Sequence, residues 1–103
     1  MIALLVAAAA LAASRPDIDA ELRRGEAIAV ARCGRCHAVG LDGVSLRQAA
    51  PPFRELGRVY PVADLIEALA QGATPTHADM PPFTLPLAEA RALSAYVRSI
   101  QTR

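Results

Sequence analysis

The chain has 103 residues, eleven arginines and ten acidic side chains, and a formal net charge of +1. This length favours one small domain, and the nearly balanced charge, without a basic run or a patch of interleaved aromatics, excludes a nucleic-acid-binding class. Two Phe, two Tyr and no Trp provide little bulk for a core. A domain this small would gain from a large apolar cofactor.

The first segment is an unbroken apolar run from Ile2 to Ala13. A helix of that length spans about 18 Å, short of the hydrocarbon core of about 30 Å, and fits the apolar region of a secretory signal. Ala10-Leu11-Ala12 is a suitable cleavage site, although no Lys or Arg precedes the run. We therefore predict a signal peptide over residues 1–14 and a mature domain over 15–103. An uncleaved membrane anchor and an ordinary buried helix are the alternatives.

The next element is a helix that follows a short linker and ends near residue 33. Asp17 or Asp19 is expected to cap its start. Steps of three and four residues put one set of side chains on a single face. This face comprises Leu22, Gly25, Ala29 and Cys33.

Residues 38–60 are irregular, apart from an expected helical turn over 53–58. The stretch 61–72 predicts a second helix, with Pro61 at its first position and Gly72 just past its end. Its apolar face is formed by Val62, Leu65, Ile66 and Leu69.

Residues 73–84 again read as irregular, and a last helix begins at Pro86. Its apolar stripe comprises Leu87, Ala90, Leu93, Val97 and Ile100, with Tyr96 beside it. The sequence has no alternating strand pattern, so it predicts an all-α fold of three main helices and two long loops. Loops of this length in a small domain usually carry function.

The stretch RCGRCHAVG contains both cysteines, Cys33 and Cys36, followed directly by His37. A dithiol redox pair would require a βαβ context, and a structural zinc site would require four ligands, for which only His37 and His77 remain. The third interpretation is the attachment of one covalent haem c, with two thiols bonded to the haem vinyl groups and His37 on the iron. The adjacency of Cys36 and His37 favours this interpretation.

Met80 is the candidate for the sixth iron ligand, because it is the only methionine after the predicted signal. The following Pro81 and Pro82 restrict the backbone and suit a thioether held at a fixed distance. Met80 as a core filler and His77 as a rival ligand are the alternatives.

Four features make the sequence resemble the class I c-type cytochromes, the small bacterial monohaem kind. They are Gly25, the motif from Cys33 to His37, DMPPF at 79–83 and LSAYV at 93–97. The resemblance implies an all-α cytochrome c fold, with three main helices and long loops wrapped around one covalently attached haem. It also implies that the first and last helices cross with Gly25 against Tyr96. A backbone carbonyl at Pro51 or Pro52 should accept the Nδ1 hydrogen of His37.

The sequence departs from that family at several places. Ala29 stands where the family often has an aromatic, and the chain has no lysine, so the lysine ring through which eukaryotic members dock has no counterpart. Arg54, Arg58 and Tyr60 are chemically suitable partners for the haem propionates, but we expect them to be surface or rim residues.

Together these observations predict a periplasmic one-electron carrier, not an enzyme, that exchanges electrons with a donor and an acceptor protein. A haem c subunit of a periplasmic dehydrogenase or sulfur-oxidising complex is the alternative. A gas-binding or peroxidatic haem protein would require Met80 to be off the iron. Contact with a membrane is expected only if the N-terminal segment is retained, and the sequence indicates no oligomeric state.

Overall fold

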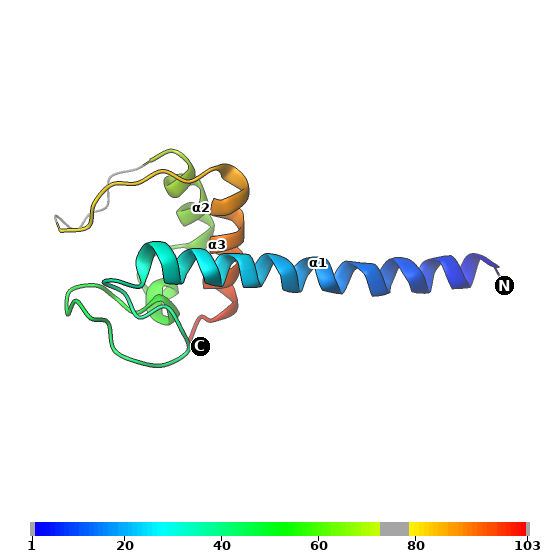
Figure 1. The fold of residues 1–103 in the computed structure, drawn as a ribbon, viewed down its shortest axis with the longest axis horizontal. Helices are drawn as coiled ribbons and strands as arrows, with labels where there is room; N and C mark the ends of the chain where they lie inside the picture. Colours follow the sequence, from blue (N-terminus) through cyan, green and yellow to red (C-terminus); the bar gives the residue numbers. More distant parts are fainter. Residues whose placement is uncertain (1, 73–78, 103) are drawn as a thin grey trace.

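The computed structural model describes residues 2–72 and 79–102, which form helices and loops without a β-strand. The elements are α1 (Ile2–Cys33), the 3₁₀ helix η1 (Phe53–Arg58), α2 (Val62–Ala70) and α3 (Leu87–Ser99), as drawn in Figure 1. The prediction of an all-α fold is confirmed. Within the same residues, no helix is both long and apolar enough to cross a membrane.

Helix α1 begins much earlier than the sequence predicts. A linker ending in a cap at Asp17 or Asp19 was expected, and this is wrong, because α1 runs unbroken from Ile2 to Cys33 and through Pro16. Alanine and leucine, which dominate the first turns, are among the strongest helix formers, so they continue the helix rather than interrupt it. The N-terminal part of α1 projects away from the rest of the molecule (Figure 1).

The C-terminal part of α1 crosses α3 at a very short separation. A Cβ atom placed on Gly25 would overlap the carbonyl oxygen of Ala92 and lie 2.7 Å from Cβ of Tyr96. One turn further along α1, Ala29 is completely buried. The predicted contact between Gly25 and Tyr96 is confirmed, and small residues at 25 and 29 are what allow the backbones to approach.

Helix α2 packs against α3, and Ser94 Oγ of α3 donates a hydrogen bond of 3.3 Å to the carbonyl oxygen of Val62. Gly72 lies past the end of α2, as expected, with φ at +69°, a conformation that favours glycine. Pro61 is the N-cap residue of α2, one position before the expected one.

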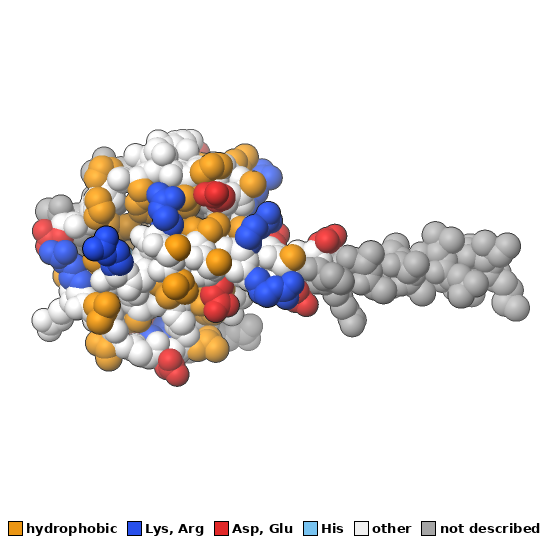
Figure 2. Space-filling model, in the orientation of Figure 1, with side chains coloured by type: hydrophobic (Ala, Val, Ile, Leu, Met, Phe, Trp, Pro, Cys, Tyr) orange, Lys and Arg blue, Asp and Glu red, His pale blue; other side chains and the backbone are white. Residues whose placement is uncertain are grey.

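The core lies between α1, α3 and η1. It consists of Ala29, Cys33, Phe53, Leu85, Ala90, Leu93, Tyr96, Val97 and Ile100. The predicted stripe of α3 is therefore buried, with one exception. Leu87 is 51% exposed, because it is the first residue of α3 and lies at the edge of the packed region. On the face seen in Figure 2, acidic and basic side chains are interspersed and form no patch of one sign.

Candidate cofactor-binding site

The two cysteines and His37 belong to one tight turn at the C-terminal end of α1. Cys33 is the last residue of the helix, and its carbonyl oxygen accepts hydrogen bonds from the backbone N–H groups of Cys36 (3.2 Å) and His37 (3.0 Å). Continuation of the last helical turn therefore brings both thiols and the imidazole to one end of α1. This explains in physical terms why the three residues must be so close in sequence.

The orientation of the His37 ring is set by the segment 51–53. Nδ1 of His37 lies 2.8 Å from the carbonyl oxygen of Pro51, and the Phe53 ring lies 5.0 Å from the imidazole at an angle of 46°. Because a carbonyl oxygen only accepts hydrogen bonds, Nδ1 carries the hydrogen and Nε2 has the free lone pair. The prediction that a carbonyl at Pro51 or Pro52 accepts this hydrogen is confirmed, with Pro51 as the acceptor.

Both cysteines are free thiols, but their environments differ. Cys33 is buried, and burial raises the pKa of its thiol to about 11, with the nearby charge of Arg32 acting in the opposite direction. Cysteines that perform redox chemistry have lowered pKa values, because the thiolate is the nucleophile. The Cys33 environment therefore argues against the dithiol interpretation.

A cavity of about 680 Å³ opens beside this turn. Its volume lies within the range of about 300–1,000 Å³ that is typical of small-molecule and cofactor sites. The lining residues are Arg32, Cys33, Arg35, Cys36, His37, Arg47, Ala49, Ala50, Asp79, Met80, Pro81 and Phe83. All four residues predicted to bind haem therefore face the same space.

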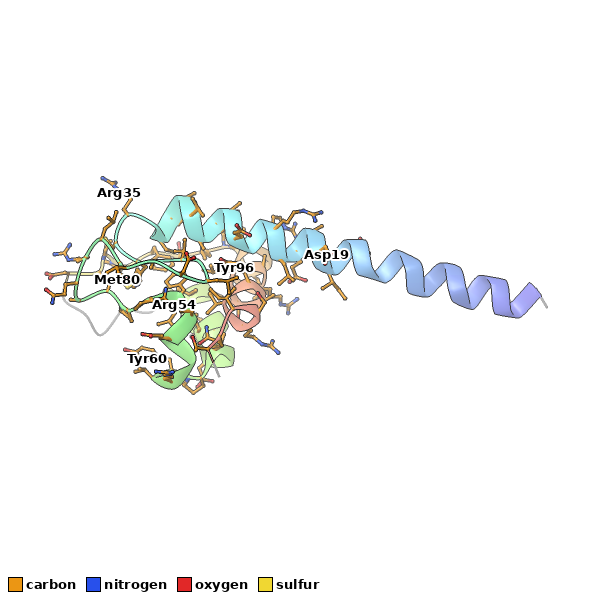
Figure 3. The ribbon with its side chains drawn as sticks, turned by 90° about the horizontal axis from the view of Figure 1, so that it is seen from below. Asp19, Arg35, Arg54, Tyr60, Met80 and Tyr96 are labelled. Atoms are coloured by element: carbon orange, nitrogen blue, oxygen red, sulfur yellow. The ribbon has the colours of Figure 1, made fainter. Side chains whose placement is uncertain are left out.

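Three separate segments meet at this cavity: the end of α1 with its turn, the loop before η1, and the segment 79–83. Met80 and Arg35 lie at the end of the molecule where α1 ends (Figure 3). His77, the rival ligand, is outside the described residues. Among the residues that are described, no group of three or more His, Cys, Asp and Glu side chains could hold a metal ion.

The sequence did not predict the arginines around the cavity. Arg47 Nη2 forms an ion pair of 3.1 Å with Asp79 Oδ2, which joins the loop before η1 to the segment that carries Met80. Arg32 and Arg35 also line the cavity. Arg32 and Arg35 directly precede the two cysteines, so the sequence shows that they are close to the motif. Nothing in the sequence indicated that Arg47 would form an ion pair with Asp79.

The three residues considered for the propionates, Arg54, Arg58 and Tyr60, are not part of the cavity lining. Arg58 and Tyr60 are exposed, as expected of surface residues. Arg54 is half-buried, and its Nη1 is a buried nitrogen without a hydrogen-bond partner among the residues described. Burial of a charged nitrogen without a partner costs free energy, so Arg54 differs from the rim residue that was expected.

The loop between His37 and η1 is fixed by one hydrogen bond from α3 and by two hydrogen bonds within the segment 36–47. The Tyr96 hydroxyl donates to the carbonyl oxygen of Val39 (2.6 Å), and Ser45 Oγ accepts from the N–H of Ala38 (3.0 Å). The N–H of Arg47 donates to the carbonyl oxygen of Cys36 (3.1 Å). One wall of the cavity is therefore held by the same helix crossing that buries Gly25.

In a comparison with known protein families, residues 20–97 match cytochrome c oxidase, cbb3-type, subunit III. The chain belongs to this family. The match covers most of the sequence and includes the cysteine motif, the Met80 segment and α3, so the small c-type cytochrome inferred from the sequence is confirmed. No curated protein and no solved structure matches the chain.

Membership of this cytochrome family implies haem c. The donor set of the cavity fits that group: two free thiols, an imidazole with Nε2 available and a thioether line one space. The two thiols suit attachment to the haem vinyl groups, and imidazole and thioether sulfur are ligands that haem iron accepts.

Proposed function

We propose that this cytochrome domain is a periplasmic one-electron carrier with one haem c attached covalently to Cys33 and Cys36. His37 and Met80 are its two axial ligands. The observation that carries the proposal is that these four side chains line one cavity, while Pro51 holds the His37 ring by its other nitrogen.

Haem c, when bound, supplies an Fe(II)/Fe(III) couple. The residues around the haem would set the reduction potential of that couple. The hydrogen bond from His37 Nδ1 to Pro51 makes the imidazole a stronger electron donor, and the Met80 thioether favours the reduced state and raises the potential. If His37 and Met80 both held the iron, no iron position would be open to a substrate. This supports a carrier rather than an enzyme.

The decisive experiment expresses the protein with an export signal and a haem-attachment system, then extracts it with acidified acetone. We expect haem to remain with the protein after denaturation. The matched variants Cys33→Ser and Cys36→Ser should each lose one of the two thioether bonds. Haem that leaves entirely with the solvent from the unaltered protein would refute covalent attachment.

The name of the family favours a second role, as the haem c subunit of a cbb3-type oxidase or a related respiratory complex rather than as a free carrier. Electron transfer would then occur inside a stable assembly. Size exclusion of gently solubilised native membranes separates the two roles. Elution in a large haem-containing complex supports the subunit, and elution near the mass of the monomer supports the free carrier.

A further inference from the structure

Gln101, two residues past the end of α3, has a side-chain amide whose NH₂ and carbonyl groups both form hydrogen bonds. Its Nε2 donates to the carbonyl oxygens of Phe53 and Val97, each at 2.7 Å, and its Oε1 accepts from the N–H of Gly57 at 2.6 Å. The orientation of the amide is determined by these partners, because a flipped amide would place its oxygen against two carbonyl oxygens. Gln101 therefore joins the end of α3 to both ends of η1.

The next residue strengthens the same connection. The backbone N–H and the hydroxyl of Thr102 both donate to the carbonyl oxygen of Arg54, at 2.8 and 3.0 Å. Residues 101 and 102 therefore hold two consecutive carbonyl groups, those of Phe53 and Arg54. Long-range hydrogen bonds of this kind, between residues almost fifty positions apart, fix η1 against α3.

The segment held in this way is the one that orients His37. Pro51 accepts the Nδ1 hydrogen and Phe53 supplies the ring contact, and the N–H of Phe53 donates to the carbonyl oxygen of Ala38 at 2.9 Å. Both groups that fix the imidazole thus lie within two residues of the carbonyl that Gln101 holds. Phe53 itself is buried, so a shift of its backbone would move the Phe53 side chain and, through it, the His37 imidazole.

We propose that Gln101 is a positioning residue for the His37 imidazole. It keeps the segment 51–53 in the place where Pro51 can accept the Nδ1 hydrogen and Phe53 can pack on the ring. Its relevance to haem ligation rests on the function proposed above, whereas the contacts themselves involve only residues of the chain.

The test is the rate at which the His37 Nδ1 hydrogen exchanges with solvent, followed by NMR in the purified protein, which is kept reduced if it contains haem. Gln101→Met keeps the length of the side chain and removes all three hydrogen bonds. We expect exchange to become about tenfold faster, since each lost bond makes local opening of the 51–53 segment easier. Gln101→Glu can still accept from Gly57 but cannot donate to Phe53, and it should also exchange faster.

The matched control is Ser94→Ala, which removes a buried hydrogen bond between α3 and α2 that does not involve the 51–53 segment. It should lower the denaturation midpoint, with a much smaller effect on His37 exchange than Gln101→Met. Equal acceleration in Gln101→Met and Ser94→Ala, or none in either, would overturn the positioning role.

Haem content is measured separately in each variant from the spectrum of the denatured protein. A protein without covalent haem would refute the proposed function. The exchange comparison would still decide the role of Gln101, because the hydrogen bond from His37 to Pro51 needs no cofactor.

Discussion

Through its hydroxyl group, Tyr96 connects the crossing of α1 and α3 to the loop between His37 and η1, which forms one wall of the cavity. That hydroxyl donates to the carbonyl oxygen of Val39, and the side chain is largely buried. Tyr96→Phe keeps the packing against Gly25 but leaves the carbonyl without its donor. We expect a loss of about 1 kcal/mol in the free energy of unfolding, measured by denaturant titration. An unchanged midpoint would mean that water replaces the hydroxyl without cost.

Met80 is the residue whose replacement most directly tests the axial ligation. Met80→Ala should abolish the weak far-red absorption of a Met–Fe(III) bond, lower the reduction potential and let cyanide or carbon monoxide bind. The reason is that removal of the thioether eliminates the ligand that favours Fe(II) and opens one iron position. Absorption spectra and a redox titration measure these changes.

His77→Ala is the matched comparison, because His77 is three positions before Met80 in the sequence and an imidazole is a good ligand for iron. We expect its spectrum to match that of the unaltered protein. The opposite pattern, with an open site in His77→Ala and a closed one in Met80→Ala, would indicate two histidine ligands and a lower potential.

Some single-residue features were predictable and others were not. The bond from His37 to Pro51 followed from the resemblance, because it depends on a local motif and a proline at a suitable distance. The ion pair between Arg47 and Asp79 depends on how two irregular segments fold toward each other. Periodicity carries no information about such segments, so the sequence could not indicate the pairing.

At the level of whole helices, Gly25→Ala provides a test of the crossing between α1 and α3. Helix propensity predicts that this substitution stabilises the protein, whereas packing predicts that it destabilises it. In a free helix, Gly→Ala stabilises by about 1 kcal/mol. At position 25 the added Cβ would overlap the Ala92 carbonyl, so we expect Gly25→Ala to destabilise the protein by about 1–3 kcal/mol. Chemical denaturation measures the difference.

Ala27 is exposed on the same helix and provides the control for this substitution. Ala27→Leu should change the stability by less than about 0.5 kcal/mol, as is usual for surface sites. A stabilising Gly25→Ala would show that α1 and α3 do not pack as closely as the structure indicates.

Helix positions were predicted well where polar and apolar residues alternate with helical period, as in α3, and less well where they do not. In α1 the leader is apolar on every side, so no change of pattern marks a boundary, and the acidic residues at 17 and 19 suggested a start that the helix does not have. The short η1 was predicted at its observed position, because Pro51 and Pro52 precede it and Pro61 follows it closely.

For the molecule as a whole, the all-α architecture was predictable because the chain lacks any strand pattern and all three long helices carry an apolar face. The cavity was not predictable in shape, since two of the three segments that line it, the loop before η1 and the segment 79–83, have no regular periodicity. Its presence nevertheless agrees with the shortage of large aromatic side chains in the sequence. The space beside Cys33 and His37 is where a cofactor would complete the apolar interior.

Stability should fall at alkaline pH, and Tyr96 is one cause. Burial, with a smaller contribution from the charge of Glu26, raises the pKa of Tyr96 above its usual value of about 10. The unfolded chain therefore loses this proton at a lower pH than the folded protein. Because the folded state then binds more protons, the free energy of unfolding decreases as the pH rises above about 10.

Tyr96→Phe removes this titration, so its stability should depend less steeply on pH in the same range. Cys33 does not contribute if its sulfur is a thioether, because a thioether has no proton to lose. Denaturation at a series of pH values from neutral to alkaline measures how the free energy of unfolding depends on pH in the unaltered protein and in Tyr96→Phe. The same dependence in both proteins would show that groups other than Tyr96 cause the loss of stability at alkaline pH.

The final prediction concerns the N-terminal segment, which we expect to be removed during export. Among the residues of α1 whose burial is described, the first buried one is Gly25, and residues 17–20 are exposed. Removal of residues 1–14 should therefore leave the helix crossing and the cavity intact. Mass spectrometry of protein purified from the periplasm should give a first residue between Ala13 and Arg15.

Two variants separate export from folding. Leu5→Arg places a charge inside the apolar run, so it should block export and, with it, haem attachment outside the cytoplasm. A protein that starts at Arg15 behind an unrelated, cleavable signal should instead be exported, carry haem and unfold at the same denaturant concentration as the natural mature protein. Protein that retains Met1 and sediments with membranes would show that the segment is an anchor. In that case the projecting part of α1 would place the cavity at a distance from the bilayer surface.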